Sequence, residues 1–220
     1  MLSRVSSSSL RRIGRRIPNR TFSFSFAGPR TLEDILKKEM VEDKSAAEVA
    51  DIWANYHSSK ENVHGLVLKA GKVKSLLSRA AQSPFFVQPV FREDGYFMMI
   101  SQFQEPAHFL MAYLEDYKMD PVAAQPLLTF SVFDDFAEEK EIVLVRADVL
   151  NRGLDDTEGL KVVRNMLDVY ADDAEYESVH AFNKAPDQFD FDDFVSRQNE
   201  KWRAEAGMAK DDDDDDDAQK

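Results

Sequence analysis

The sequence predicts an α+β domain with a single, mostly antiparallel β-sheet whose helices pack mainly on one face. Runs of β-branched and aromatic residues follow one another along the chain, with short turns between most of them. Amphipathic helical patterns stand mostly before and after these runs. Neighbouring strands between flanking helices are typical of the α+β class, and no internal repeat is visible in the chain.

Two helices are expected before the first strand. The segment 31–40 carries an apolar stripe made of Leu32, Ile35, Leu36 and Met40. The segment 45–58 begins with Ser45 and Glu48 in a capping box, in which each residue satisfies the other's free helix-end group. Its apolar residues then recur at helical spacing, namely Val49, Ile52, Trp53 and Tyr56.

Strands are expected from residue 63 onward, at 63–70, 85–91, 96–104, 127–133 and 141–149. The turn signal Asp94-Gly95 joins two of them into a hairpin. The segment 108–118 is expected to begin as a strand and to end as a short helix. Further helices are expected at 72–82, 155–170 and 189–202.

Neither face of the strand 96–104 is clearly polar enough to face solvent. The other expected strands each have one apolar face, and by analogy with them Phe97, Met99 and Phe103 belong to the core. Met is flexible and recurs on surfaces that accept imperfectly matched apolar partners. We therefore expect the opposite, mixed face of the sheet to bind a protein partner through Tyr96, Met98, Ile100, Leu144 and Arg146. Coverage of this face by the two C-terminal helices stays an open alternative.

Charge divides the chain into three parts. Residues 1–32 contain seven Arg and no acidic residue, so we expect residues 1–30 to be a mitochondrial transit peptide. A chloroplast address and a disordered basic arm are the alternatives. The other 188 residues hold 21 basic and 41 acidic side chains, a net charge of −20 that argues against nucleic acid as the partner. Seven consecutive Asp predict a disordered acidic tail at 205–220, which leaves 31–204 as the folded domain.

The sequence contains no motif that demands chemistry. It has no Cys, which excludes thiolate metal sites and cysteine nucleophiles. The closest approach to a phosphate-binding loop runs from Gly65 to Val73, but it has five residues between its glycines and Val in place of Ser or Thr. The four His stand apart. We expect no catalytic, cofactor-binding or metal-binding residues, and no apolar run approaches the ~18 residues needed to span a bilayer.

Two other functions stay open at this point. One is a small matrix enzyme that uses Asp134 or Glu138 near His108. The other is a scaffold or adaptor for a different matrix complex. Paired carboxylates do not favour the enzyme by themselves, because 41 acidic residues produce such pairs by chance.

Four specific segments occur along the chain, namely Phe86–Pro89, Tyr117-Lys118, Ala137–Lys140 and Ile142–Leu144. In their order and spacing, they and the segments around them resemble the mitochondrial F1-ATPase assembly factors. The resemblance covers about Thr31 to Tyr170, and the residues after Tyr170 match only loosely.

This resemblance implies a monomeric chaperone of the mitochondrial matrix without enzymatic activity, cofactor or stable membrane insertion. Members of the family hold the unassembled β subunit of ATP synthase, prevent its aggregation and deliver it for assembly with the α subunit. The family has no short catalytic motif to transfer, so the resemblance singles out no contact residues. Free β subunit exposes apolar surface that α later covers, and covering that surface reversibly would suffice.

Overall fold

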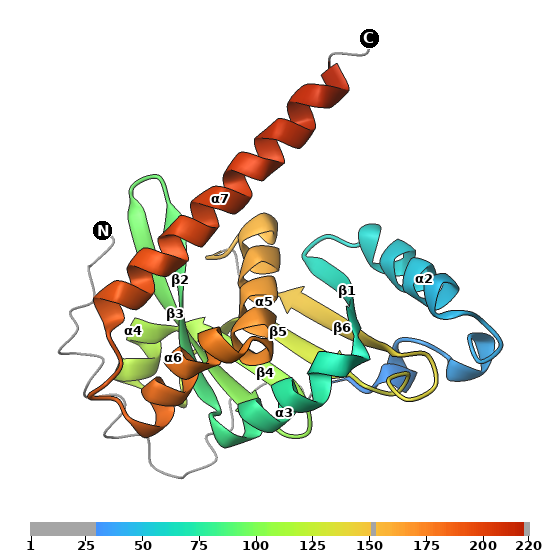
Figure 1. Cartoon of the computed structure of the whole chain (residues 1–220), viewed down its shortest axis with the longest axis horizontal. Coiled ribbons are helices and arrows are strands. Elements are labelled where there is room, and N and C mark those ends of the chain that lie inside the picture. Colours follow the sequence, from blue (N-terminus) through green and yellow to red (C-terminus); the bar gives the residue numbers. More distant parts are fainter. Residues whose placement is uncertain (1–29, 151–152, 218–220) are drawn as a thin grey trace.

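The computed structural model describes residues 30–150 and 153–217, with the backbone alone for 206–217. In this part of the chain six antiparallel strands form one sheet in the order β1-β6-β5-β4-β3-β2. The sheet curls strongly around the helices (Figure 1). The α+β class is thus confirmed. The strands are β1 (Val63–Lys69), β2 (Phe85–Arg92), β3 (Gly95–Gln104), β4 (His108–Tyr113), β5 (Pro126–Phe133) and β6 (Ile142–Val149).

The hairpin predicted from Asp94-Gly95 is confirmed. Arg92 of β2 lies opposite Gly95 of β3, so Glu93 and Asp94 form a two-residue loop. Gly95 has φ = 145°, a backbone conformation that residues other than glycine rarely adopt. The turn fixes the register of both strands, with Val87 opposite Ile100 and Pro89 opposite Met98.

Four helices cover one side of the sheet, which we call the helix face and which carries Phe86, Phe109 and Phe130. They are α3 (Val73–Gln82), α5 (Asp156–Ala171), α6 (Asp173–Lys184) and α7 (Phe191–Asp217). The ring of Tyr170 in α5 lies 5.6 Å from that of Phe109, and Phe86 meets Phe182 of α6 at 5.9 Å. Figure 1 shows α5 and α6 in front of the strands on this side.

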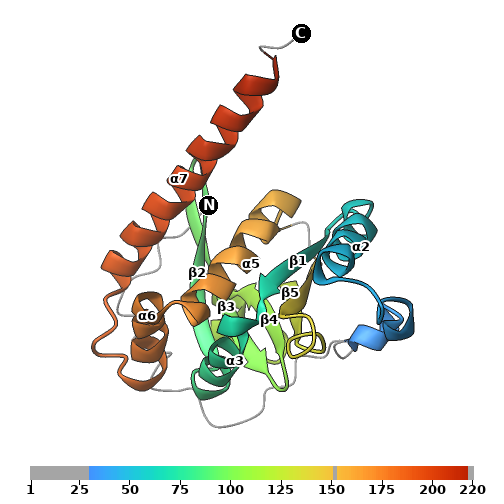
Figure 2. The same ribbon diagram turned by 45° about the vertical axis from the view of Figure 1, so that its right-hand side comes forward.

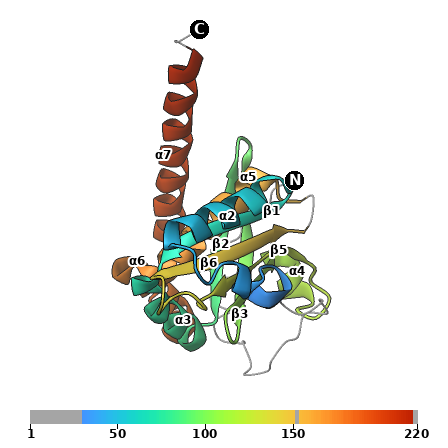
Figure 3. The ribbon, with the colours of Figure 1, turned by 90° about the vertical axis from the view of Figure 1, so that its right-hand side faces the viewer.

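Two helices cover parts of the opposite side, which we call the second face. Helix α2 (Ala46–Ser58) lies over β1 and β6, as Figure 3 shows, and the indole of Trp53 donates to the carbonyl of Val145 at 3.2 Å. The close approach depends on Gly65, because a Cβ there would lie 2.5 Å from Nδ1 of His57. Helix α4 (Leu114–Met119) contacts β3 and β4, and its Tyr117 ring lies 6.5 Å from Phe85.

The N-terminal helix predictions have different outcomes. Helix α2 and its capping box are confirmed, since Ser45 Oγ accepts from the Glu48 N–H at 3.3 Å and the Glu48 carboxylate accepts from the Ser45 N–H at 2.9 Å. The helix predicted at 31–40 is wrong, because the chain forms two 3-10 turns there, Leu32–Asp34 and Lys38–Met40. Leu32 and Val41 are both buried against α2, yet one continuous helix would separate them by about two and a half turns and point them in opposite directions.

The far end of α7 projects away from the sheet (Figures 1 and 2). Its helical backbone continues to Asp217, whereas the sequence predicts a disordered tail from residue 205. That disorder stays a prediction, as does the transit peptide, of which residues 1–29 lie outside the described residues. None of the described helices combines the length and the apolar character needed to cross a bilayer.

Candidate partner-binding surface

The five residues expected to bind a partner do not form an exposed patch. Met98 is 3% exposed, Ile100 1%, Leu144 0% and Arg146 8%, while Tyr96 is half-buried. Four of the five side chains are therefore buried in the described structure, and their role in partner binding stays a prediction. Contact between a partner and the four buried side chains would first require local opening of the domain.

The second face is buried for two reasons that alternation along single strands does not reveal. Helix α4 follows β4 directly and folds back over β3 and β4. Helix α2 buries Leu144, which packs in one cluster with Trp53 and Phe133. The strand order also places β4 and β5 between β3 and β6, so Ile100 and Leu144 belong to different ends of the sheet. The C-terminal helices, which were the alternative cover for this face, lie on the helix face instead.

Arg146 already has a partner within its own strand. Its Nε donates to Oδ2 of Asp148 at 2.9 Å and its Nη2 donates to Oδ1 at 2.6 Å. Residues two apart on a strand point to the same face, which allows this bidentate pair. The guanidinium is therefore engaged in the fold and is not free to set the register of a partner.

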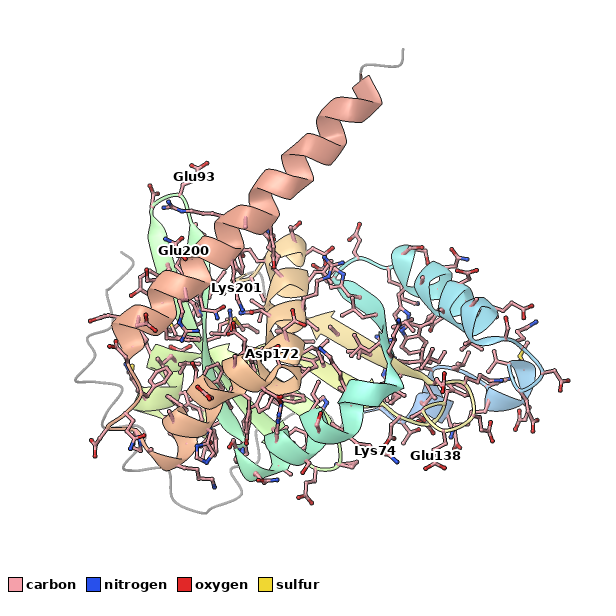
Figure 4. All side chains as sticks on the ribbon, in the orientation of Figure 1. Lys74, Glu93, Glu138, Asp172, Glu200 and Lys201 are labelled. Carbon is pink, nitrogen blue, oxygen red and sulfur yellow. The ribbon has the colours of Figure 1, made fainter. Side chains whose placement is uncertain are left out.

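Of the candidate catalytic residues, His108 and Asp134 line one groove of about 380 Å³, and Glu138 does not. Glu138 is exposed, and its Oε1 lies 3.8 Å from Nζ of Lys74. Figure 4 labels both residues at the lower right of the molecule. Nδ1 of His108 lies 2.8 Å from Oγ of Ser131, and burial lowers the pKa of His108 to about 4. A histidine with that pKa is neutral at pH 7 but a weak general base.

The described residues bring no metal-binding set together, since no three His, Asp or Glu side chains cluster among them closely enough to hold an ion. Nε2 of His108 is buried and has no hydrogen-bond partner, so no carboxylate orients this ring as it would in a catalytic triad. The groove thus holds a desolvated imidazole without the supporting groups of acyl-transfer chemistry.

The two edges of the sheet differ in a way that sequence reasoning missed. In the β2–β3 ladder the Phe103 N–H bonds to the Pro84 carbonyl, so alternation makes the backbone groups of Phe85, Val87, Pro89 and Phe91 point outward. The amide of Asn183 in α6 donates to the carbonyl of Phe85 and accepts from its N–H. Pro89 has no N–H to offer. The β2 edge is therefore closed to a further strand.

The β1 edge has no such closure. The Val149 N–H bonds to the Asn62 carbonyl, and the Ala70 N–H bonds to that of Glu141, which fixes the alternation at both ends of β1. The outward backbone groups are those of Val63, Gly65, Val67 and Lys69. Within the described chain those of Gly65 and Val67 make no backbone hydrogen bond outside the ladder. In Figures 1 and 2, β1 stands between α5 and α2 with no strand along its outer side.

A groove of about 630 Å³ lies at the C-terminal end of β1, between it and the helices of the helix face. Leu68, Val73, Leu76 and Leu167 provide its apolar walls, and charged side chains form its rim. At that rim Nζ of Lys201 donates to Oε1 of Glu175 at 2.6 Å. Lys201 of α7 and Asp172 before α6 lie on the front of the molecule in Figure 4. An alternating apolar strand in the sequence gives no sign of this groove, because its walls come from three elements.

Comparison with known proteins identifies the family of this chain. The family model described as ATP11 protein matches residues 13–195. A mouse protein named ATP synthase mitochondrial F1 complex assembly factor 1 is 29% identical over 171 residues, which are 77% of this chain and 52% of the relative. The human protein of the same name is 29% identical over 168 residues, covering 76% of this chain and 51% of its own length.

The chain thus spans about half the length of the curated relatives it matches. The match to the family model is longer than half of this chain and contains all six strands and the helices from α2 to α6. The chain belongs to the ATP11 protein family.

Proposed function

We propose that this protein is a non-catalytic assembly factor of the mitochondrial matrix that binds the unassembled β subunit of F1-ATPase, prevents its aggregation and delivers it to the α subunit. The observation that carries the proposal is membership of the ATP11 protein family, whose curated relatives are named as assembly factors of the mitochondrial F1 complex. The choice of β over α comes from the resemblance in the strands and the short helix, which includes Phe86–Pro89 and Tyr117-Lys118.

The physics of assembly supports a binding role. A subunit that awaits its neighbour exposes apolar surface, and such surface aggregates. A chaperone has to cover it with an affinity that the final neighbour can exceed. The net charge of −13 favours long-range attraction to a basic client surface and keeps the free chaperone soluble by self-repulsion.

Aggregation of purified F1 subunits tests this proposal. Unassembled β subunit and, separately, α subunit are diluted from denaturant with and without an equimolar amount of this protein, and light scattering is followed. We expect scattering of β to fall and scattering of α to stay unchanged. Protection of α alone, or of neither subunit, contradicts the proposal.

Affinity purification from mitochondria addresses the scaffold alternative. The proposal expects F1 β subunit as the main captured protein and a matrix location in protease-protection experiments. Recovery of a different matrix complex without F1 subunits favours the scaffold. The enzyme alternative predicts a different outcome. Replacing His108 or Asp134 would then abolish an enzymatic activity, while chaperone activity stays normal.

A further inference from the structure

We propose that the outer edge of β1 receives an extended segment of the unassembled F1 β subunit as a seventh strand of the sheet, with side chains of that segment entering the groove beside Leu68. This inference rests on the proposed function, because it takes the client to be an F1 subunit. It assigns to that client a docking mode based on main-chain hydrogen bonds and an adjacent apolar groove.

The backbone of β1 favours a strand as the ligand. Val63, Gly65, Val67 and Lys69 direct their N–H and C=O groups away from β6 at every second residue. Only an extended chain presents complementary groups at that spacing, whereas a helix satisfies its own. No proline interrupts β1, and Lys69 at its end is the only Lys, Arg, Asp or Glu of the strand.

The contrast with the other edge supports a role for this one. Proteins block edge strands with proline, charges or covering groups, because an open edge pairs with foreign chains. Here Pro89 and Asn183 block β2, yet β1 has neither device. Protection at one edge and openness at the other is the arrangement expected when the open edge has a ligand.

The groove determines the side chains that the added strand should carry. Leu66 and Leu68 point to the helix face and are half-buried, so the side chains of a neighbouring strand on the same face would lie beside them. The groove extends this apolar surface with Val73, Leu76 and Leu167. We therefore expect the client segment to alternate, with apolar residues on the side that faces α5.

Charge complementarity indicates that the client segment carries a basic residue next to its apolar residues. The Asp168 carboxylate at the rim accepts no hydrogen bond in the described chain, although Lys72 and Lys201 line the same groove. The residue as a whole is exposed, but its carboxyl is partly desolvated by the groove walls, which raises its pKa. A Lys or Arg of the client that reaches Asp168 would relieve this cost, in keeping with the negative charge of the whole chain.

Amide hydrogen exchange of the complex with β subunit provides the most direct test. In the free protein, the amides of Leu66 and Leu68 are already bonded to β6, and those of Gly65, Val67 and Lys69 are not. We expect binding to protect the second set at alternate residues. If these three amides exchange equally fast with and without bound β subunit, the proposed strand addition is wrong.

Three pairs of variants test the same surface through affinity. Val67→Pro removes an outward N–H, and Val67→Ala keeps it. Gly71→Phe adds bulk at the groove, where a Cβ meets no atom within 4 Å, and Gly71→Ala adds a methyl group only. Asp168→Lys reverses the rim charge, and Glu93→Lys makes the same change at the hairpin tip (Figure 4). We expect the first member of each pair to weaken binding about tenfold and the second to leave it within about twofold.

The outcomes separate the two proposals. If the wild-type protein does not bind the β subunit, the proposed function fails and the docking mode fails with it. If the wild-type protein binds β subunit and all three surface variants bind equally well, the docking mode alone is wrong. Gly71→Phe keeps the test decisive should Val67→Pro unfold. If the free protein forms dimers in which the amides of Gly65 and Val67 are protected, the edge belongs to a second copy, and the inference is also wrong.

Discussion

Arg92 and Glu158 form two parallel hydrogen bonds that fasten the β2–β3 hairpin to the start of α5. Nε of Arg92 donates to Oε1 at 2.6 Å and Nη2 donates to Oε2 at 2.7 Å. Oε2 of Glu158 also accepts from the N–H of Asp155 at 2.9 Å, and Oδ1 of Asp155 accepts from the Glu158 N–H at 2.7 Å. One carboxylate therefore completes a capping box and a bidentate ion pair at the same time.

Replacing Glu158 by Gln is expected to destabilise the domain by about 2 kcal/mol, as measured by urea unfolding. Breaking a fully buried pair costs ~3–5 kcal/mol, and the smaller value follows because the Arg92 side chain is 40% exposed. Burial alone would raise the pKa of Glu158, but the bonds from Arg92 and Asp155 hold it below its usual range. The difference between wild type and variant should therefore be present above pH 4.5 and shrink as the pH falls below it. Glu93→Gln at the exposed hairpin tip should have no effect.

His108 should make the fold sensitive to moderate acid. Its pKa of about 4 in the folded protein lies below the 6.5 of an unfolded chain, so the unfolded state binds more protons between these values. Stability is then fully present above about pH 6.5 and falls by up to about 3 kcal/mol toward pH 4. Thermal unfolding in steps of pH measures the loss. His108→Gln should flatten that part of the profile, and an unchanged profile would show that the ring is not desolvated.

Aspartate at Met98 or Ile100 is expected to unfold the domain and not to act on binding alone. Met98 is 3% exposed and Ile100 is 1% exposed, so a carboxylate at either site would be buried without a partner. A loss of about 4 kcal/mol or more should be visible in circular dichroism melting curves. Val122→Asp provides the matched control, since Val122 is 58% exposed. A well-folded Ile100→Asp protein that no longer binds β subunit would restore the sequence-based face.

Gly65 and Gly71 are expected to respond oppositely to the same methyl group. A Cβ at Gly65 lies 2.5 Å from His57 Nδ1 and 2.9 Å from Trp53 Nε1, so Gly65→Ala has to push α2 away from β1. Overpacking of this kind costs about 1–3 kcal/mol. A Cβ at Gly71 meets nothing within 4 Å, and Gly71→Ala should be neutral or slightly stabilising. Chemical denaturation of both variants measures the difference, and equal stabilities would show that α2 yields without cost.

The end of α7 should lose helicity at low ionic strength. Seven consecutive Asp stand at its C-terminal end, where the helix dipole disfavours negative charge and like charges repel. Amide exchange from residue 205 onward should therefore be fast in dilute buffer and slower in molar salt. Replacing the seven Asp by Asn should slow it at low salt too. Removing residues 205–220 should leave the melting temperature of the domain unchanged.

Much of the fold could be predicted because local signals agreed with it. The strands alternate or carry β-branched runs, Asp94-Gly95 marks a turn, and Ser45 with Glu48 caps α2. Helix α6 was missed although its start has a readable signal. Asp172 accepts from the N–H groups of Ala174 and Glu175, and Val179 and Phe182 follow at helical spacing. The helix prediction for 31–40 is wrong for the opposite reason. Its apolar stripe is a readable helix signal, but the path of the chain there depends on contacts with α2.

The candidate surface could not be predicted from the sequence. Alternation tells which residues of one strand share a face, but it does not tell what covers that face. The burial of Ile100 and Leu144 depends on α4 and α2, which pack there through tertiary contacts. The edge position of β2 has one sign in the sequence, Pro89, because proline in a sheet is confined to edges and bulges. No comparable residue identifies β1, whose place is set by pairing with a strand about 80 residues later in the chain.

The two residues that close the β2 edge, Asn183 of α6 and Pro89 of β2, also limit how copies of this protein can associate. A filament requires that the β1 edge of each molecule pair with the β2 edge of the next, without end. Asn183 already occupies both backbone groups of Phe85, and Pro89 lacks the donor that such pairing needs. Molecules that meet through their sheets can therefore join only in pairs, β1 against β1. A protein with one open and one closed sheet edge is thus prevented from polymerising through its own sheet.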